Sequence, residues 1–492
     1  MTESTSIQRH LISRVSINLL ANLLQGVLGI ILIPLATYVL SPVDYGVYGM
    51  ASVIVALVVA MCETGSTYVL YGHYLGLDTA GRATLQSTLL VLALALGLFA
   101  GGLLFLAWPA VSQYVPLLSE LTPTEIGLLC FTIPLRTSWA IMNPILIVNQ
   151  RSNLLAASVL LQSIVNMVVM LVCLYLFDSG RAALFWGQAG GLLACLALPL
   201  FLLGASVWVP LSWQWLLQVR KVALGAWCTG LVDNTRSAIE SALIARTASG
   251  DVLGNYNHAR VYQGLMTQGT NAFSNVLWPV ALKEAQVAGS QFTRIRPIWD
   301  LVYAGLACAG VGAVFLGNEL VSLLTHGKFL EAGAWLPWLM VYVMLQSAGK
   351  PATAMIFASQ EGNQYSLIRT STVLTAVLAL LLLVPVFGVA AVLAVAIGEM
   401  LMTRAWLAAA VRRISPVPFQ DHWVVVGSVL TVACCLLEPA LDLALIERCL
   451  VTAGFWCLIA GALFLTLRMR LGVDWYRSLY RREARHFEDS HV

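Results

Sequence analysis

Residues 35–51 read LATYVLSPVDYGVYGMA, and a related stretch, LIARTASGDVLGNYNHA, occupies residues 243–259. A Gly-x-Tyr turn that begins at Gly46 in the first stretch aligns with one that begins at Gly254 in the second, an offset of 208 residues (254 − 46). Because the polar turn residues match, and not only the apolar ones, chance similarity is the weaker interpretation. The stretch 35–51 is therefore predicted to open one of two similar halves.

A second turn repeats at nearly the same spacing. IVNQRSN at residues 147–153 resembles FASQEGN at residues 357–363, an offset of 210 (357 − 147). Two matches at nearly one offset predict two halves of six spans each, residues 1–206 and 221–411. Since six is even, the halves share one topology about an axis along the membrane normal, an arrangement that transporters use with a site between the repeats.

The composition places the chain in a membrane. Of its 492 residues, 59% are hydrophobic and only 10% are charged, and the mean hydropathy is +0.83. Soluble domains carry about 25% charged residues, so an integral membrane protein is predicted. The 10 cysteines lie in or beside apolar runs and form no CxxC pair, which favours neither a disulfide framework nor a metal site.

Apolar runs of roughly 20 residues mark the spanning helices. Fourteen are predicted, at residues 13–40, 46–71, 84–110, 124–147, 154–177, 182–206, 221–246, 257–282, 298–325, 332–358, 366–387, 389–411, 423–442 and 447–469. The first run is too long for a signal peptide and is read as a retained membrane helix. The fold class is an all-α polytopic membrane protein with two six-helix parallel repeats around a central cavity plus two C-terminal helices.

The remaining segments complete the predicted organisation. Residues 207–220 form a Trp-rich linker that suits a short helix in the membrane interface. Residues 412–470 hold the two additional helices, and residues 471–492 form a basic tail. Lys and Arg concentrate in the loops on the side of the N-terminus, which predicts that both termini face the cytoplasm.

The first 65 residues also carry a family resemblance. NLLANLLQGVLGIILIPLATYVLSPVDYGVYGMASVIVALVVAMCETG (18–65) resembles the N-terminus of the Wzx-type polysaccharide flippases, and GAWCTGLVDN (225–234) with VLGNYNHA (252–259) resembles the opening of their second half. The resemblance implies the multidrug/oligosaccharidyl-lipid/polysaccharide (MOP) transporter fold. It also implies flipping of a polyprenyl-diphosphate-linked oligosaccharide across the inner membrane for exopolysaccharide, O-antigen or capsule synthesis. The two C-terminal helices depart from the commoner twelve-span members.

Charges inside the spans are the candidate coupling residues. Asp233, Arg236 and Glu240 share one face of the seventh span, spaced so that Arg236 can pair with either carboxylate. The triad has a net charge of −1, so Asp233, Glu240 and also Glu63 of the second span are candidates for coupling transport to H⁺ or Na⁺. A structural role as a helix staple is the alternative.

Other polar residues are candidates for binding the cargo. Arginine forks suit phosphate oxygens, so the candidate diphosphate ligands are Arg136, Arg236, Arg260 and Lys350. The alternative is that Arg136 and Lys350 pair with Glu63 or Glu399 and hold helices together. The candidate sugar contacts are Asn18, Asn22, Asn271, Asn275, Tyr256 and Trp278.

Several functions are disfavoured by what the sequence lacks. It has no Walker A motif, no HExxH and no Ser/His/Asp set, so the chain is predicted not to be an enzyme and to need no cofactor or nucleic acid. The expected partners are a lipid-linked oligosaccharide, membrane lipids and other polysaccharide-assembly proteins such as a polymerase. The alternatives are a cation-coupled drug or metabolite antiporter, a membrane polymerase or ligase, and an assembly scaffold.

Overall fold

The computed structural model describes residues 20–21, 24–63, 66, 69–70, 74, 77–149, 151–203, 211–285, 296–358, 362–414, 422–441 and 443–471. An apolar helix, Leu24–Val39, comes first and is called the first helix below. The other long helices are α2 (Pro42–Cys62), α4 (Thr79–Tyr114), α5 (Pro123–Val148), α6 (Ser152–Tyr175), α7 (Ala182–Leu203), α8 (Trp213–Thr247), α9 (Gly250–Ala285), α10 (Arg296–Thr325), α11 (Leu330–Ala358), α12 (Gly362–Phe387), α13 (Val389–Ile414), α14 (His422–Leu441) and α15 (Leu445–Leu471).

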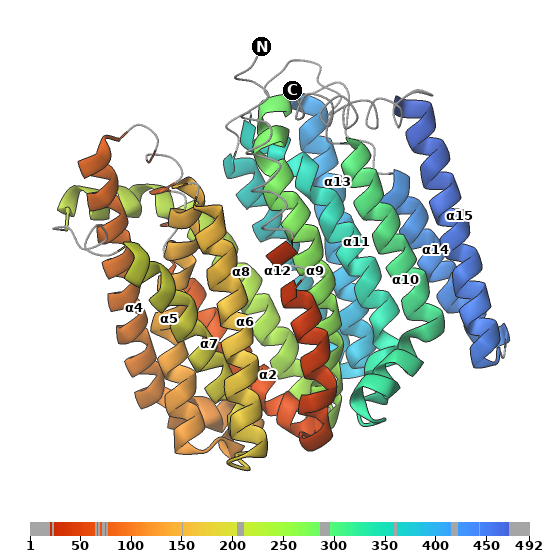
Figure 1. Cartoon of the computed structure of the whole chain (residues 1–492), viewed down its shortest axis with the longest axis horizontal. Coiled ribbons are helices and arrows are strands. Elements are labelled where there is room, and N and C mark those ends of the chain that lie inside the picture. The colour runs from red at the N-terminus through yellow and green to blue at the C-terminus, as the bar shows by residue number, and fades with distance from the viewer. Residues whose placement is uncertain are drawn as a thin grey trace, which may run out of the picture.

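These helices form two bundles side by side (Figure 1). In this view α4 to α7 lie at the left and α10 to α13 at the right, with α14 and α15 on the far edge, while the first helix is drawn across α9, where the two bundles meet. Within the described residues, ten helices are long and apolar enough to cross a membrane. The four remaining predicted spans correspond to the first helix, α8, α9 and α11. The predicted fold class, an all-α polytopic membrane protein, is confirmed.

Two helix boundaries differ from the prediction. A capping box formed by Ser41 and Asp44, with Pro42 in the first turn, starts α2 at residue 42, and α2 ends at Cys62 instead of continuing to residue 71. The 35-residue α8 begins at Trp213, inside the stretch predicted as a separate linker. At 1.5 Å per residue its length is about 52 Å, well beyond a hydrocarbon core of about 30 Å.

The start of α8 packs on the N-terminal half before the helix enters the C-terminal half. The backbone amide of Ser212 donates to Oγ1 of Thr88 in α4 at 3.1 Å. Further along, Trp227 Nε1 donates to the carbonyl of Met61 in α2 at 3.1 Å. The remainder of α8 packs against α12. A single rigid element therefore connects the two halves.

The helices α14 and α15 lie on α10, away from the N-terminal half. Trp456 Nε1 donates to the carbonyl of Cys308 at 2.8 Å. Arg448 pairs with Glu319 at 2.7 Å and with Glu438 at 3.2 Å. Both helices thus extend the edge of the C-terminal half and leave the boundary between the halves uncovered.

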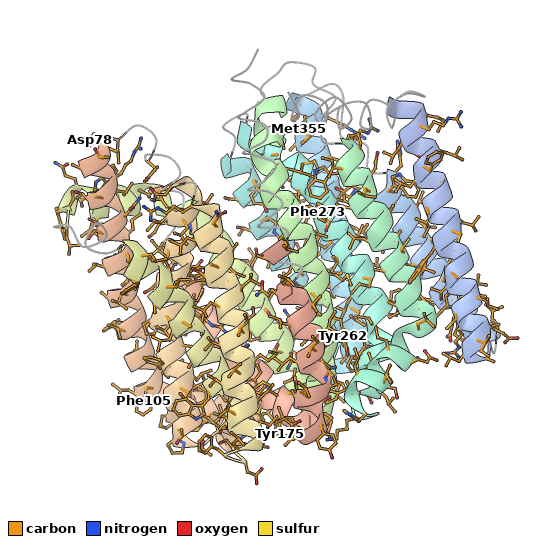
Figure 2. The ribbon with its side chains drawn as sticks, viewed as in Figure 1. Asp78, Phe105, Tyr175, Tyr262, Phe273 and Met355 are labelled. Atoms are coloured by element: carbon orange, nitrogen blue, oxygen red, sulfur yellow. The ribbon has the colours of Figure 1, made fainter. Side chains whose placement is uncertain are left out.

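The two ends of the bundle can be told apart by labelled residues. Asp78 and Met355 lie at one end, and Phe105 and Tyr175 lie toward the other (Figure 2). The second of these ends is where α2 and α9 begin. We call it the outer end, because the Lys and Arg distribution predicts that it faces away from the cytoplasm.

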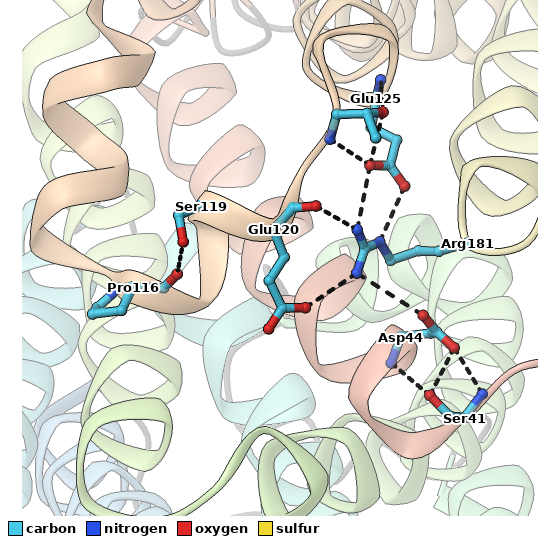
Figure 3. Close-up of polar contacts among 8 residues, drawn as sticks. Ser41, Asp44, Pro116, Ser119, Glu120, Glu125 and Arg181 are labelled. Atoms are coloured by element: carbon cyan, nitrogen blue, oxygen red, sulfur yellow. Dashed lines mark hydrogen bonds and ion pairs between the residues drawn. The ribbon is translucent and has the colours of Figure 1, made fainter.

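One arginine fastens the outer end of the N-terminal half (Figure 3). Arg181 reaches Glu125 in the first turn of α5 at 3.0 Å, Glu120 of the 3₁₀ helix Pro116–Glu120 at 3.4 Å and Asp44 of α2 at 3.9 Å. Asp44 and Glu125 are also the capping-box residues of their helices. The starts of α2 and α5 therefore share one ionic anchor.

Candidate functional site

The two halves meet most closely at the outer end. A Cβ atom added to Gly46 of α2 would lie 2.5 Å from the carbonyl oxygen of Gly250. A Cβ on Gly254 of α9 would overlap the carbonyl group of Pro42. Only glycine lets the two backbones come this close. The Gly-x-Tyr stretches, predicted as turns, lie instead in the first turns of α2 and α9 and face each other across the boundary.

Side chains on both flanks of these glycines extend the contact. Tyr38 of the first helix meets His326 edge to face at 5.5 Å, and its carbonyl accepts from Lys328 Nζ at 2.7 Å. Tyr45 of α2 contacts the rings of His258 and Phe329 at 5.4 and 5.2 Å. We call this contact between the halves the outer seam.

Replacing Gly254 with alanine is expected to part the outer seam. The new methyl group would meet the Pro42 backbone, which cannot swing aside as a flexible side chain could. Thr37, which is fully buried and hydrogen-bonded to the carbonyl of Leu324, serves as a reporter when changed to cysteine. We expect several-fold faster labelling of Thr37→Cys by a membrane-impermeant maleimide in the Gly254→Ala background.

The matched control for this change is Gly269→Ala on the same helix, because a Cβ there meets nothing within 4 Å. Labelling of the same protein with Thr37 unchanged is subtracted, because that signal comes from the native cysteines alone. Equal labelling of Thr37→Cys in the two alanine backgrounds would contradict a seam that depends on Gly254.

A ladder of six alternating charges runs through the C-terminal half. In order, its members are Asp233, Arg369, Glu399, Arg236, Glu240 and Arg260, from α8, α12, α13 and α9. Successive pairs lie 2.7, 3.1, 2.8, 3.2 and 3.6 Å apart. Glu399 is fully buried at its centre. The side chains of Asp233 and Arg260 at the two ends are 39% and 33% exposed, so both ends are open to exchange with water or a ligand.

The ladder revises the expected pairing of the seventh span. Arg236 does pair with Glu240, as helical spacing predicted, but Asp233 pairs with Arg369. Glu399 pairs with Arg236 and Arg369. The alternative that Glu399 holds Arg136 or Lys350 in place is therefore wrong. With three carboxylates and three arginines the set is neutral, whereas the triad alone carries −1. Tyr256, which was expected to contact sugar, donates its hydroxyl to Glu240 at 2.6 Å.

Two cations lie outside the ladder. Lys350 of α11 donates to Oδ1 of Asn271 at 2.7 Å. Arg136 of α5 faces the phenol of Tyr48. Neither forms an ion pair with a carboxylate within the part of the chain that the structure describes. The fourth helix of each half thus carries one cation that lacks a counter-charge, next to a proline inside the helix, Pro134 or Pro351.

The remaining predicted site residues are Glu63, Asn18, Asn22, Asn275 and Trp278. Glu63 is exposed at the C-cap of α2. Asn18 and Asn22 lie outside the described residues, and so do the side chains of Asn275 and Trp278. The structure therefore brings together Arg236, Glu240, Asp233 and Arg260, with Lys350 and Asn271 joined to each other and Arg136 in the other half.

Arg369 is the ladder member that the sequence pattern did not single out. It falls near the start of the predicted span 366–387 and was assigned to a cytoplasmic loop. In the structure it lies in α12 with its side chain only 14% exposed. One sequence signal could have identified Arg369. It is a lone arginine within eight residues of the start of an apolar helix, a position where a buried carboxylate partner on another helix is to be expected.

Comparison with known proteins identifies the family to which the chain belongs. A protein-family model described as "Polysaccharide biosynthesis protein" matches residues 37–294, which is more than half of the chain. The chain belongs to this polysaccharide biosynthesis family. The match includes residues 37–65 of the first stretch that resembled flippases, and all of residues 225–234 and 252–259. No curated protein sequence matches the chain.

The fold of this polysaccharide biosynthesis family member is that of known transporters. The lipid II flippase MurJ, in an inward closed conformation, superposes with a TM-score of 0.71 at 11% identity, covering 91% of this chain and 98% of MurJ. A multidrug resistance MATE family transporter of the MOP superfamily, in an inward-facing conformation, gives 0.64 at 14% identity, with 82% and 98% covered. These TM-scores establish that the chain shares its fold with MurJ and the MATE transporter, as the predicted fold class required.

Proposed function

We propose that the chain is a secondary transporter that flips a polyprenyl-diphosphate-linked oligosaccharide from the cytoplasmic to the periplasmic leaflet of a bacterial inner membrane. Both termini would face the cytoplasm, and the product would serve exopolysaccharide, O-antigen or capsule synthesis. The observation that carries the proposal is a pair of cations, Arg136 in the N-terminal half and Lys350 in the C-terminal half, that lack a carboxylate partner among the described residues of this polysaccharide biosynthesis family member.

The charges of the core favour an anionic cargo. A charge at the centre of a membrane helix costs about 2.5–3.5 kcal/mol on insertion scales unless it finds a partner or water. The ladder neutralises its own members, so Arg136 and Lys350 are left for a ligand. A diphosphate supplies negative oxygens for an arginine fork and for an ammonium group.

The outer seam supports alternating access as the mode of transport. It joins the halves at one end through backbone contacts at Gly46 and Gly254. Rocking of one half against the other about an axis in the plane of the membrane would part this seam and close the opposite end. Asp233 and Glu240 remain candidates for coupling this cycle to an ion gradient, because Asp233 is partly exposed and Glu240 is shared by two arginines.

A cation-coupled drug antiporter is the competing proposal. Such a transporter needs an acidic cavity to attract a cationic drug. In the described core, Asp233, Glu240 and Glu399 are each held by at least one arginine. The balance of charge therefore favours the flippase.

The proposal is tested by mass spectrometry of lipid extracts from host cells depleted of the protein. We expect one polyprenyl-diphosphate oligosaccharide to accumulate, and to be accessible only from the cytoplasmic face of inverted vesicles. Cells complemented with the wild-type chain are the control and should lose the accumulated lipid. If no lipid-linked sugar accumulates and the cells become sensitive to cationic compounds, the antiporter replaces the flippase.

A further inference from the structure

A pocket of about 300 Å³ lies on the boundary between the two halves. The first helix and α6 line it from the N-terminal half, and α9 lines it from the C-terminal half. Its volume is at the small end of the range for ligand pockets, and equals the liquid volume of about ten water molecules. The pocket could therefore hold one ring-sized group and not a whole oligosaccharide.

The lining of this pocket is largely apolar, with four polar but uncharged side chains set into it. Gln25, Ser163, Asn166 and Gln268 supply amide and hydroxyl groups, and none of the lining residues is ionisable. A charged group placed there would be desolvated without a counter-charge, which is strongly unfavourable. Amide and hydroxyl side chains instead match ligands rich in hydroxyl or acetamido groups.

One of these polar groups lacks a partner. The Oε1 atom of Gln268 is buried and accepts no hydrogen bond from any described residue. A buried acceptor left unsatisfied costs about 1–3 kcal/mol. Gln268 also lines the pocket, so a turn of its side-chain amide toward the pocket would let a hydroxyl or amide donor on a ligand satisfy this oxygen.

Two glycines shape the site. A Cβ on Gly264 of α9 meets nothing within 4 Å, so the position opens directly on the space of the pocket. On α7, a Cβ on Gly187 would lie 2.6 Å from Oδ1 of Asn166, so this glycine leaves room for the amide that lines the pocket. Arg260, at the exposed end of the ladder, precedes Gly264 by about one helical turn.

We propose that this pocket binds one neutral sugar ring of the cargo, an uncharged hexose or N-acetylhexosamine, while cations outside it hold the diphosphate. The inference rests on the proposed flippase function and adds selectivity to it. A cargo whose ring carries a carboxylate is excluded from the pocket, because no lining residue offers a positive charge. The amide groups, and Gln268 above all, provide the preference for the sugar over bare lipid diphosphate.

The test measures binding to the full-length protein in lipid nanodiscs by native mass spectrometry. Three probes are compared: polyprenyl diphosphate, the same lipid bearing N-acetylglucosamine, and the same lipid bearing glucuronate. For the wild-type chain we expect the neutral sugar to improve affinity about tenfold over the sugar-free lipid, the size of one well-satisfied buried hydrogen bond. The glucuronate probe should gain nothing.

The variant Gly264→Leu fills the pocket without a clash at Cβ and should abolish the preference for the neutral sugar, while sugar-free lipid still binds. Gly269→Leu is the matched control, since it lies on the same helix, has open space around it and does not line the pocket. Gln268→Leu should lower the preference several-fold. Thermal melting of each variant in the same nanodiscs establishes that it is folded.

The outcomes separate this inference from the function on which it rests. If wild-type protein binds the sugar-free and neutral-sugar lipids equally, or if glucuronate binds as tightly as N-acetylglucosamine, the pocket assignment is overturned and the flippase stands. A preference that survives Gly264→Leu also overturns it. If the wild-type chain binds no polyprenyl diphosphate at all, the flippase proposal falls as well.

Discussion

Replacing Glu399 with glutamine is expected to lower the free energy of unfolding by about 3–5 kcal/mol, the cost of breaking a buried ion pair by removing one partner. Glu399 is fully buried and is the only ladder carboxylate that lies between two buried arginines, Arg236 at 2.8 Å and Arg369 at 3.1 Å. The variant leaves an excess positive charge in the core of the C-terminal half. Unfolding in mixed detergent micelles, followed by tryptophan fluorescence, measures the loss.

Glu438→Gln is the matched control for this change. Glu438 also pairs with an arginine in a membrane helix, but its side chain is 23% exposed and Arg448 keeps its second partner, Glu319. We expect a loss below about 1 kcal/mol, as for exposed pairs. Adding Arg369→Met to Glu399→Gln restores charge balance and should recover part of the stability. Unfolding of Glu399→Gln at the wild-type midpoint would show that the ladder does not stabilise the fold.

Neutralising Arg136 and Lys350 together is expected to reduce flipping by at least a hundredfold. Hydrogen bonds to charged groups contribute about 1.5–3 kcal/mol each, so each single variant, Arg136→Gln or Lys350→Gln, should lose about tenfold or more. The two residues lie in different halves but would share one diphosphate as ligand, so their effects are expected to be coupled, and the double variant measures that coupling. Flipping is measured in proteoliposomes with a polyprenyl-diphosphate sugar as substrate.

The control for this experiment is a single variant that keeps the positive charge at residue 350. Lys350→Arg preserves a cation beside Asn271 and should retain most of the flipping activity. If the activity of Lys350→Arg falls to that of Lys350→Gln, the role of Lys350 is in packing. Thermal melting distinguishes the two causes, because removing an unpaired cation from the core should not destabilise the fold. Full activity of the double glutamine variant would rule out these two residues as the diphosphate site.

Helical periodicity was sufficient to predict the helices, the repeat and the Arg236–Glu240 pair, since each depends on residues close in sequence. It could not predict which faces meet. The contact between Asp233 and Arg369 joins residues 136 positions apart, and that between Arg369 and Glu399 joins separate helices. No local pattern encodes either. The sequence pattern therefore predicted that Asp233, Arg236 and Glu240 pair only with one another, although Asp233 and Arg236 also have partners on α12 and α13.

The seam, in contrast, was visible as a repeated motif but not as a contact. Gly46 and Gly254 were aligned by the repeat, and the structure brings their turns against Pro42 and Gly250. Equivalent positions of two parallel repeats meet at their shared axis, so internal symmetry by itself could have suggested the contact. The pocket at Gln25 and Gln268 required coordinates, because its walls come from three helices that are distant in sequence.

The neutrality of the ladder has an electrical consequence. A rocking half that carries no net charge does no work against the membrane potential, whereas each uncompensated charge crossing it exchanges about 2.3 kcal/mol per 100 mV. In the proposed cycle, Arg136 and Lys350, which have no carboxylate partner among the described residues, would be uncompensated in the empty carrier and balanced once a diphosphate is bound. The loaded step should therefore be nearly electroneutral. The empty step should be electrogenic, with an inside-negative voltage drawing the two cations toward the cytoplasm and resetting the carrier for its next cargo.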